Sequence, residues 1–134
     1  MKKTFPAKYD NLKTIRSFLS NFLKDQKIDN KKAKSIELAV DEAASNIIKH
    51  GYKVEDKNNK IEIRLEIIKK KLFIHLLDNA KPVDVGRIKH RNLENIKPGG
   101  LGVFFMYEIM DQVKWDKEDK NWNNRLTMIK NLKE

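Results

Sequence analysis

Three short stretches of this sequence carry residues whose types and spacing are suited to catalysis or to binding a ligand. Glu42 and Asn46 are four residues apart, so on a helix they share a face, where a carboxylate and an amide supply a base and a metal ligand. Asp78 directly follows an apolar run, where an acid faces a pocket. The glycines within residues 99–102 precede a second apolar run. Glycines let the backbone approach a ligand closely, and the unpaired N–H groups at a helix N-terminus are suited to binding phosphate.

Each stretch taken alone also has a purely structural interpretation. Glu42 and Asn46 fit an ordinary helix surface, and Asp78 fits a residue that caps a turn. The glycines fit a flexible lead-in to a helix. They do not form a P-loop, because no Gly-Lys-Ser/Thr follows, and they do not form a dinucleotide-binding fingerprint, because no strand directly precedes them.

Residue content excludes several other kinds of site. The chain has 0 cysteines, which excludes disulfides, zinc–thiolate sites and thiol nucleophiles. Its 3 histidines, at positions 50, 75 and 90, lack metal-ligand spacing. The tryptophans and Tyr107 fit packing residues better than base-stacking platforms.

The hydrophobic pattern predicts the helices that position these residues. Apolar residues recur every three or four positions over residues 10–26 and 30–49, which predicts two helices. Asp10 and Asp29 are the expected N-caps, and Gly51 is the expected left-handed residue after the second helix. A third, well-buried helix is expected over residues 101–110, after a long loop over 78–100.

The strands follow from a different period. Apolar and polar residues alternate over 61–67, which predicts a half-buried strand, and 72–77 is a second strand after a turn at Lys69 and Lys70. Further strands are expected at 113–115 and 122–129, and residues 1–7 suit an edge strand. Paired helices and strand hairpins together predict an α+β two-layer sandwich, with helices on one face of a mixed, mostly antiparallel sheet.

Length and charge narrow the class of protein. The 134 residues suit one domain, 1–134, and no apolar run approaches the roughly 18–20 residues that span a bilayer. We expect a soluble, cytoplasmic protein without a membrane partner. The net charge of +10 suggests nucleic acid as a partner, but only 5 of the 29 basic residues are arginine, so a solvated lysine-rich surface is favoured.

The order of the three stretches is more specific than any one of them. Residues 42–52 resemble the N-box of GHKL-type ATPases, residues 78–84 resemble the G1 box, and residues 99–102 resemble the G2 box. Within that superfamily the chain is most similar to the small anti-sigma-factor serine/threonine kinases, on the evidence of Pro82, Asp84 and the closing residues 124–127.

This resemblance implies a Bergerat (histidine-kinase-like ATPase) fold that binds ATP and Mg²⁺. It implies that Asn46 coordinates the metal, that Asp78 accepts the adenine amino group and that Glu42 is the general base for an attacking hydroxyl. Lys49 matches a phosphate-contacting position. The full set of implied nucleotide-binding residues is Asn46, Lys49, Asp78, Ala80, Lys97, Gly100, Leu101, Gly102 and Thr127.

The implied activity is phosphoryl transfer from ATP to an anti-anti-sigma (antagonist) partner, together with sequestration of a sigma factor by a homodimer. Two positions depart from the family pattern. Ala80 stands where the G1 box has glycine, and Pro98, beside Lys97, stands where an arginine is found before the glycines. Two alternatives therefore stay open: an ATP-binding partner switch without catalysis, and, from charge alone, a basic nucleic-acid-binding domain.

Overall fold

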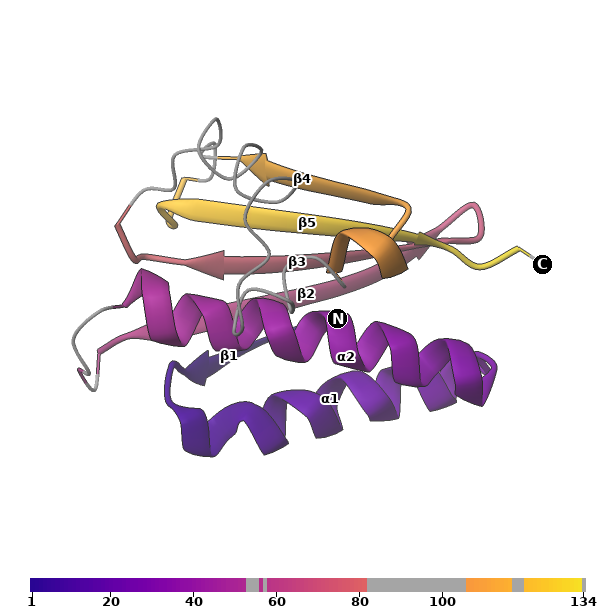
Figure 1. The fold of residues 1–134 in the computed structure, drawn as a ribbon, viewed down its shortest axis with the longest axis horizontal. Helices are drawn as coiled ribbons and strands as arrows, with labels where there is room; N and C mark the ends of the chain where they lie inside the picture. The colour runs from indigo at the N-terminus through magenta and orange to yellow at the C-terminus, as the bar shows by residue number, and fades with distance from the viewer. Residues whose placement is uncertain (53–55, 57, 82–105, 117–119, 134) are drawn as a thin grey trace.

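The computed structural model describes residues 1–52, 56, 58–81, 106–116 and 120–133 (Figure 1). Its elements form one sheet with two long helices along one of its faces. In chain order they are β1 (Lys2–Pro6), η1 (Tyr9–Asn11), α1 (Leu12–Asp25), α2 (Asn30–Asn46), η2 (Ile47–Gly51), β2 (Lys60–Ile68), β3 (Lys71–Asp78), β4 (Gln112–Asp116) and β5 (Asn124–Asn131).

The five strands lie in the order β1-β2-β3-β5-β4, and each neighbouring pair among them is antiparallel. The predicted two-layer α+β architecture is therefore confirmed, and the described strands contain no parallel pair. β2 and β3 form the predicted hairpin, with Lys69 and Lys70 in its turn. Both turn residues have positive φ, 50° and 64°, which is the backbone that joins tightly paired antiparallel strands.

The core lies between the helices and the sheet because each element turns one apolar side inward. Alternation along a strand sends every second side chain to the helix layer. α2 contributes small side chains, which let the helix approach the sheet closely. The fully or almost fully buried residues include Ile15, Leu19, Leu23, Ile36, Ala39, Ala44, Ile61, Ile63, Ile74, Leu76, Leu126 and Met128.

The predicted caps of the two helices have different outcomes. Asp29 is confirmed as the N-cap of α2, because its side chain accepts a hydrogen bond from the Lys32 N–H at 3.3 Å. Asp10 was expected to cap the first helix, but it lies inside η1. Asn11 precedes α1 instead, and its amide donates to the Pro6 carbonyl at 3.0 Å rather than capping the helix.

The second helix changes its winding at Asn46, and η2 continues it as a π-helix to Gly51. The expectation that Gly51 is a left-handed residue is wrong, since its φ lies outside that region. The constraint on this position is a different one. A Cβ here would lie 3.1 Å from the Cβ of Ala80, so a side chain would require that neighbouring segment to shift by a few tenths of an ångström.

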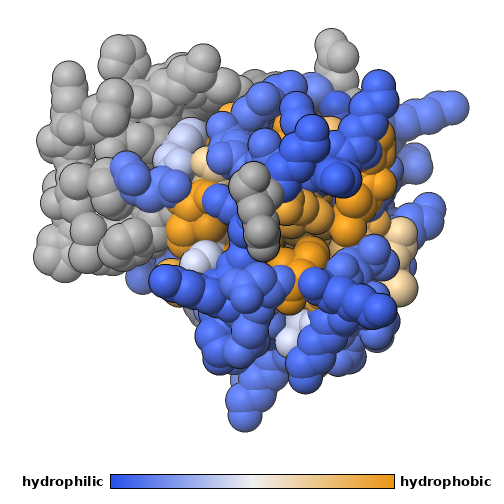
Figure 2. Space-filling view, turned by 90° about the vertical axis from the view of Figure 1, so that its right-hand side faces the viewer, coloured by the Kyte–Doolittle hydropathy of each residue, from blue (hydrophilic) through white to orange (hydrophobic). Residues whose placement is uncertain are grey.

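The remaining elements agree with the expected ranges where they are described. Residues 106–109 are helical, the helix expected to reach residue 110 ends one residue earlier, and residues 101–105 of that helix lie outside the described residues. Seen from the side of the β2–β3 turn, polar residues cover most of the surface and apolar ones show between them (Figure 2). Within the described ranges, no helix is both long enough and apolar enough to cross a membrane.

Candidate functional site

α2 carries the first pair of predicted site residues near its C-terminal end. Glu42 and Asn46 lie one turn apart and are both half-buried, and Asn46 is the last residue of α2. Their carboxylate and amide therefore stand on the same side of the helix, at the border of the core. Which ligand they contact stays a prediction.

Asp78 is the last residue of β3, and its side chain is only 4% exposed. Its Oδ1 accepts two hydrogen bonds of 2.9 Å, one from the Ala80 N–H and one from the Asn124 amide. Burial raises the pKa of this carboxyl, and the two hydrogen bonds partly oppose that shift. Asp78 thus does cap the turn, and among the described residues both of these bonds end on Oδ1.

Two asparagines at the start of β5 hold the turn that follows Asp78. Asn79 Oδ1 accepts from the Asn123 N–H at 2.9 Å, and the Asn123 amide donates to the carbonyls of Asn79 and Ala80 at 3.1 and 3.2 Å. The Asn124 amide also reaches the Lys81 carbonyl at 3.2 Å. Neither asparagine was among the site residues predicted from the sequence, although two adjacent amides before an apolar strand were a usable signal.

Tyr52 connects the same turn to the end of η2. Its hydroxyl donates to the Lys60 carbonyl and accepts from the Asn79 N–H, both at 2.7 Å. Burial raises the pKa of this phenol, and the charge of Asp78 acts in the same direction. The turn that follows Asp78 is therefore in direct contact with the end of η2, the segment that continues α2 beyond Asn46.

Lys49 lies on an exposed part of η2. It borders a small hollow of about 180 Å³ between η2 and the segment that links β1 to α1. The lining of this hollow is Ala7, Lys8, Tyr9, Ile48, Lys49, Tyr52 and Asn59. Contact of Lys49 with a phosphate remains a prediction.

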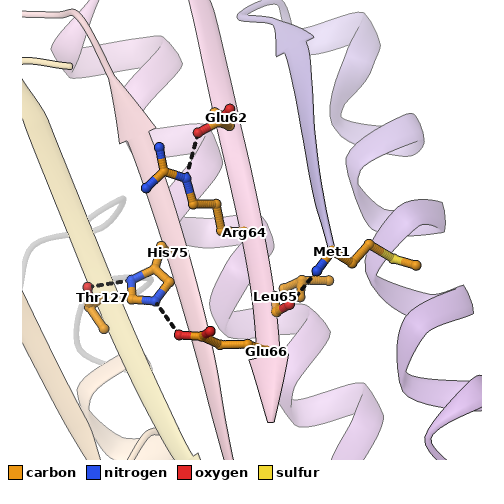
Figure 3. Close-up of polar contacts among 7 residues, drawn as sticks. All are labelled: Met1, Glu62, Arg64, Leu65, Glu66, His75 and Thr127. Carbon is orange, nitrogen blue, oxygen red and sulfur yellow. Dashed lines mark hydrogen bonds and ion pairs between the residues drawn. The ribbon is translucent and has the colours of Figure 1, made fainter. Parts of the chain in front are cut away.

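Thr127 does not join the residues around Asp78. Asp78 pairs with Asn124 in the sheet register, and Thr127 pairs with His75. Because Asn124 and Thr127 are an odd number of residues apart, their side chains leave opposite faces of the sheet. Thr127 Oγ1 lies 2.8 Å from His75 Nδ1 on the face that Figure 3 shows. Asn124, not Thr127, is the β5 residue that contacts Asp78.

The structure therefore brings two of the three predicted stretches together. The end of α2 with η2 meets the turn after β3, through Tyr52 and through Gly51 against Ala80. The third stretch falls outside the described residues. The predicted residues Gly100, Leu101 and Gly102 of that stretch, and Lys97 before it, are therefore not described.

The donor set at the end of α2 fits magnesium held mainly by phosphate. Among the described residues, no group of three or more His, Cys, Asp or Glu side chains is arranged to hold a metal. Mg²⁺ typically binds proteins through one or two oxygen ligands and keeps water and substrate phosphates as the others. A single amide oxygen from Asn46 is compatible with that mode, whereas a cation caged by protein alone is not.

Comparison with known proteins identifies the family. Residues 5–130 match the histidine kinase-like ATPase domain family, and the chain belongs to this family. It is similar to the serine-protein kinase RsbW of Staphylococcus aureus strain bovine RF122 / ET3-1, with 29% identity over 121 residues that cover 84% of this chain and 76% of the relative. RsbW of the Newman strain matches with the same identity and coverage.

Solved structures confirm the predicted fold. The RsbU and RsbW domains of Rv1364c from Mycobacterium tuberculosis align with a TM-score of 0.69 at 13% identity, over 98% of this chain and 32% of that one. The catalytic domain of the histidine kinase ThkA aligns with a TM-score of 0.54 at 12% identity, over 96% and 94% of the two chains. The predicted Bergerat fold and the resemblance to the small anti-sigma kinases are thus confirmed.

Proposed function

We propose that this protein is an ATP- and Mg²⁺-dependent anti-sigma regulator that phosphorylates a serine or threonine of an anti-anti-sigma partner. One arrangement carries the proposal: buried Asp78 lies in a turn that contacts the segment directly after the helix of Glu42 and Asn46. Family membership and similarity to proteins named serine-protein kinase RsbW support it.

In this proposal the two ends of the nucleotide meet different elements. Asp78 accepts the adenine amino group, with Ala80 beside the base and Asn124 holding the carboxylate. Lys49, Lys97 and the backbone of residues 100–102 contact the phosphates. Asn46 holds Mg²⁺, which neutralises phosphate charge when it is bound.

Glu42 is the proposed general base for the transfer. Its carboxylate takes the proton of the partner's hydroxyl, the hydroxyl oxygen forms a bond to the γ-phosphorus, and the bond from that phosphorus to the β–γ bridging oxygen breaks, which releases ADP. Most of the rate enhancement comes from positioning and charge neutralisation, because phosphoryl transfer needs little covalent chemistry from the protein. The half-buried position of Glu42, one turn before Asn46, suits this role.

The partners are part of the proposal. We propose that a homodimer binds a sigma factor in one nucleotide state and the antagonist in the other, in the cytoplasm where sigma factors act. Light scattering of the purified protein tests the dimer, and co-purification with a sigma factor in the presence of ATP or ADP tests the switch.

A second candidate function keeps nucleotide binding and drops catalysis. Pro98 occupies the position where the family pattern has an arginine, and Lys97 beside it supplies charge without a forked donor. The protein would then exchange partners with ATP or ADP and transfer nothing.

Transfer of labelled γ-phosphate from ATP to purified antagonists separates the two candidates. With the kinase, Glu42→Gln lowers the rate by about 10²–10⁴-fold, the usual span for general-base catalysis, and leaves ADP affinity unchanged. Glu37→Gln on the same helix is the matched control and keeps full activity. If no antagonist is labelled while ATP still binds, the kinase proposal fails and the switch remains.

Magnesium dependence tests the proposed role of Asn46. In wild-type protein, Mg²⁺ strengthens ATP binding, and Asn46→Ala removes that gain because the amide ligand is lost. Asn21→Ala, at an exposed position of α1, is the control. Equal gains from Mg²⁺ in Asn46→Ala and wild type would exclude the metal role.

A further inference from the structure

Two pairs of adjacent residues, 51–52 and 79–80, meet where the helix layer approaches the sheet. Gly51 is the last residue of η2 and Tyr52 follows it, whereas Asn79 and Ala80 follow directly after Asp78 and β3. Two contacts join the pairs. Tyr52 accepts the Asn79 N–H at 2.7 Å, and the backbone of Gly51 approaches the Ala80 methyl.

The approach of Gly51 to Ala80 leaves little room for a second side chain. A Cβ on Gly51 would lie 3.1 Å from the Ala80 Cβ, which is closer than carbon atoms pack without displacement. Ala80 is 5% exposed, and its backbone is held by Asp78 and by the Asn123 and Asn124 amides. The turn therefore has little freedom to move away from a larger residue.

The Tyr52 hydroxyl fixes the same junction by a second, independent contact. It donates to the Lys60 carbonyl on β2 while it accepts the Asn79 N–H, so it joins three segments of the chain. The aromatic ring between backbone and hydroxyl is rigid. The distance from the end of η2 to the turn is thus set by covalent geometry as well as by packing.

We propose that Gly51, Tyr52, Asn79 and Ala80 form a latch that positions the Asp78 carboxylate relative to the end of α2, where Asn46 lies. The inference rests on the proposed nucleotide binding. None of the four touches a reacting atom. Gly51, Tyr52 and Asn79 act only through Asp78 and Asn46, whereas Ala80 also lies beside the base in the proposed function. The latch also explains how alanine is accommodated where the family motif has glycine: the Ala80 methyl faces the position at which Gly51 lacks a side chain.

The latch makes positions 51 and 80 interdependent. Gly51→Ala places two methyl groups in a space for one and shifts the turn, so it weakens ADP binding by about tenfold or more, the usual scale of overpacking. Ala80→Gly in the same chain frees the space and returns affinity to within about threefold of the wild type. Such rescue is the sign of direct contact between the two residues.

Base selectivity distinguishes positioning from a general loss of stability. Adenine carries an amino group that Asp78 accepts, whereas hypoxanthine carries a carbonyl there, so wild type prefers ADP to inosine diphosphate. Gly51→Ala and Tyr52→Phe each shift Asp78, so each variant loses part of the preference for ADP. Adding Ala80→Gly to Gly51→Ala restores that preference. Tyr9 is an exposed tyrosine that lines the hollow beside Lys49, as Tyr52 does, so Tyr9→Phe is the matched control for Tyr52→Phe.

The experiment titrates six proteins with ADP and with inosine diphosphate and measures the urea unfolding of each. They are the wild type, Gly51→Ala, Ala80→Gly, the double variant of these two, Tyr52→Phe and Tyr9→Phe. Rescue of affinity and base preference in the double variant supports the latch. Additive losses, or an unchanged base preference in both Gly51→Ala and Tyr52→Phe, would overturn it. If the wild type binds neither nucleotide, the proposed function itself fails. Recovery of unfolding free energy in the double variant then measures only the contact between residues 51 and 80.

Discussion

Asp78 and Asn124 are direct partners in the register of β3 and β5, and the Asn124 amide donates to Asp78 Oδ1 at 2.9 Å. The two side chains are 4% and 3% exposed, so each satisfies a polar group that water does not reach. Their pairing fixes the proposed adenine-binding carboxylate in the sheet.

Removing Asn124 leaves a buried carboxylate with fewer donors. Asn124→Ala is expected to destabilise the protein by about 1–3 kcal/mol, the usual penalty for an unsatisfied buried group, and to weaken ADP binding. Chemical denaturation and ADP titration measure the two effects.

Thr127→Val is the control, since its hydroxyl lies on the other face of the sheet and contacts His75. ADP affinity is expected to stay unchanged in Thr127→Val. A loss there equal to that in Asn124→Ala would show that the two faces are not separate in function.

Replacing the Asp78 charge is expected to separate stability from binding. Burial raises the pKa of this carboxyl, so between its ordinary value near 3.8 and the raised value the folded state holds a proton that the unfolded state has released. Stability from this group therefore falls as pH rises through that interval, and the loss is complete once the pH is above the raised pKa.

Asp78→Asn keeps an acceptor oxygen and removes the charge. It is expected to match or exceed wild-type stability at pH 7 and to lose at least about tenfold in ADP affinity, the scale of a hydrogen bond to a charged group. Unfolding at pH 5 and 7 with ADP titration measures both. Clear destabilisation at pH 7, or intact ADP binding, contradicts this account.

Substitutions in the hairpin turn at Lys69 and Lys70 are expected to increase the stability of the fold. Both residues hold positive φ, which favours asparagine and glycine over lysine. Lys69→Asn with Lys70→Gly is expected to stabilise the fold by about 1 kcal/mol. The control replaces both lysines with alanine, which removes the same charges but keeps the strained backbone, and it is expected to bring no such gain in urea unfolding.

His75 is expected to make the sheet sensitive to mild acid. Burial lowers the pKa of its imidazole, and the charges of Arg125 and Arg64 lower it further. Glu66, which lies beside His75 in Figure 3, opposes these effects. Below its ordinary value near 6.5, the unfolded chain takes up a proton that the folded chain resists. This contribution to stability is thus complete above that pH and is lost as pH falls below it.

Comparison of wild type with His75→Asn at pH 7.5 and 5.5 tests this. Wild type is expected to lose more unfolding free energy on acidification than the variant. ADP affinity is expected to be equal in both at pH 7.5, because His75 lies on the face opposite Asp78. Identical pH profiles would remove His75 as the source of acid sensitivity.

Local patterns in the sequence determined which segments are helix and which are strand. The period of three to four residues in α2 and the alternation in β2 each reflect one buried side, and burial of one side is a property of neighbouring residues. The cap at Asp29 and the turn at Lys69 and Lys70 depend on contacts a few residues apart, so they too were predictable. The order of the three motif stretches pointed to the family, and we propose that those residues serve one ligand.

Only the tertiary structure decided which of those residues meet. Thr127 and Asn124 are neighbours in sequence, but the register of β5 against β3 sends one away from Asp78 and the other onto it. Gly51 fits a helix end in sequence, whereas its actual constraint is Ala80, which is 29 residues further along the chain. Contacts between distant segments depend on how whole elements pack, and no local period records them.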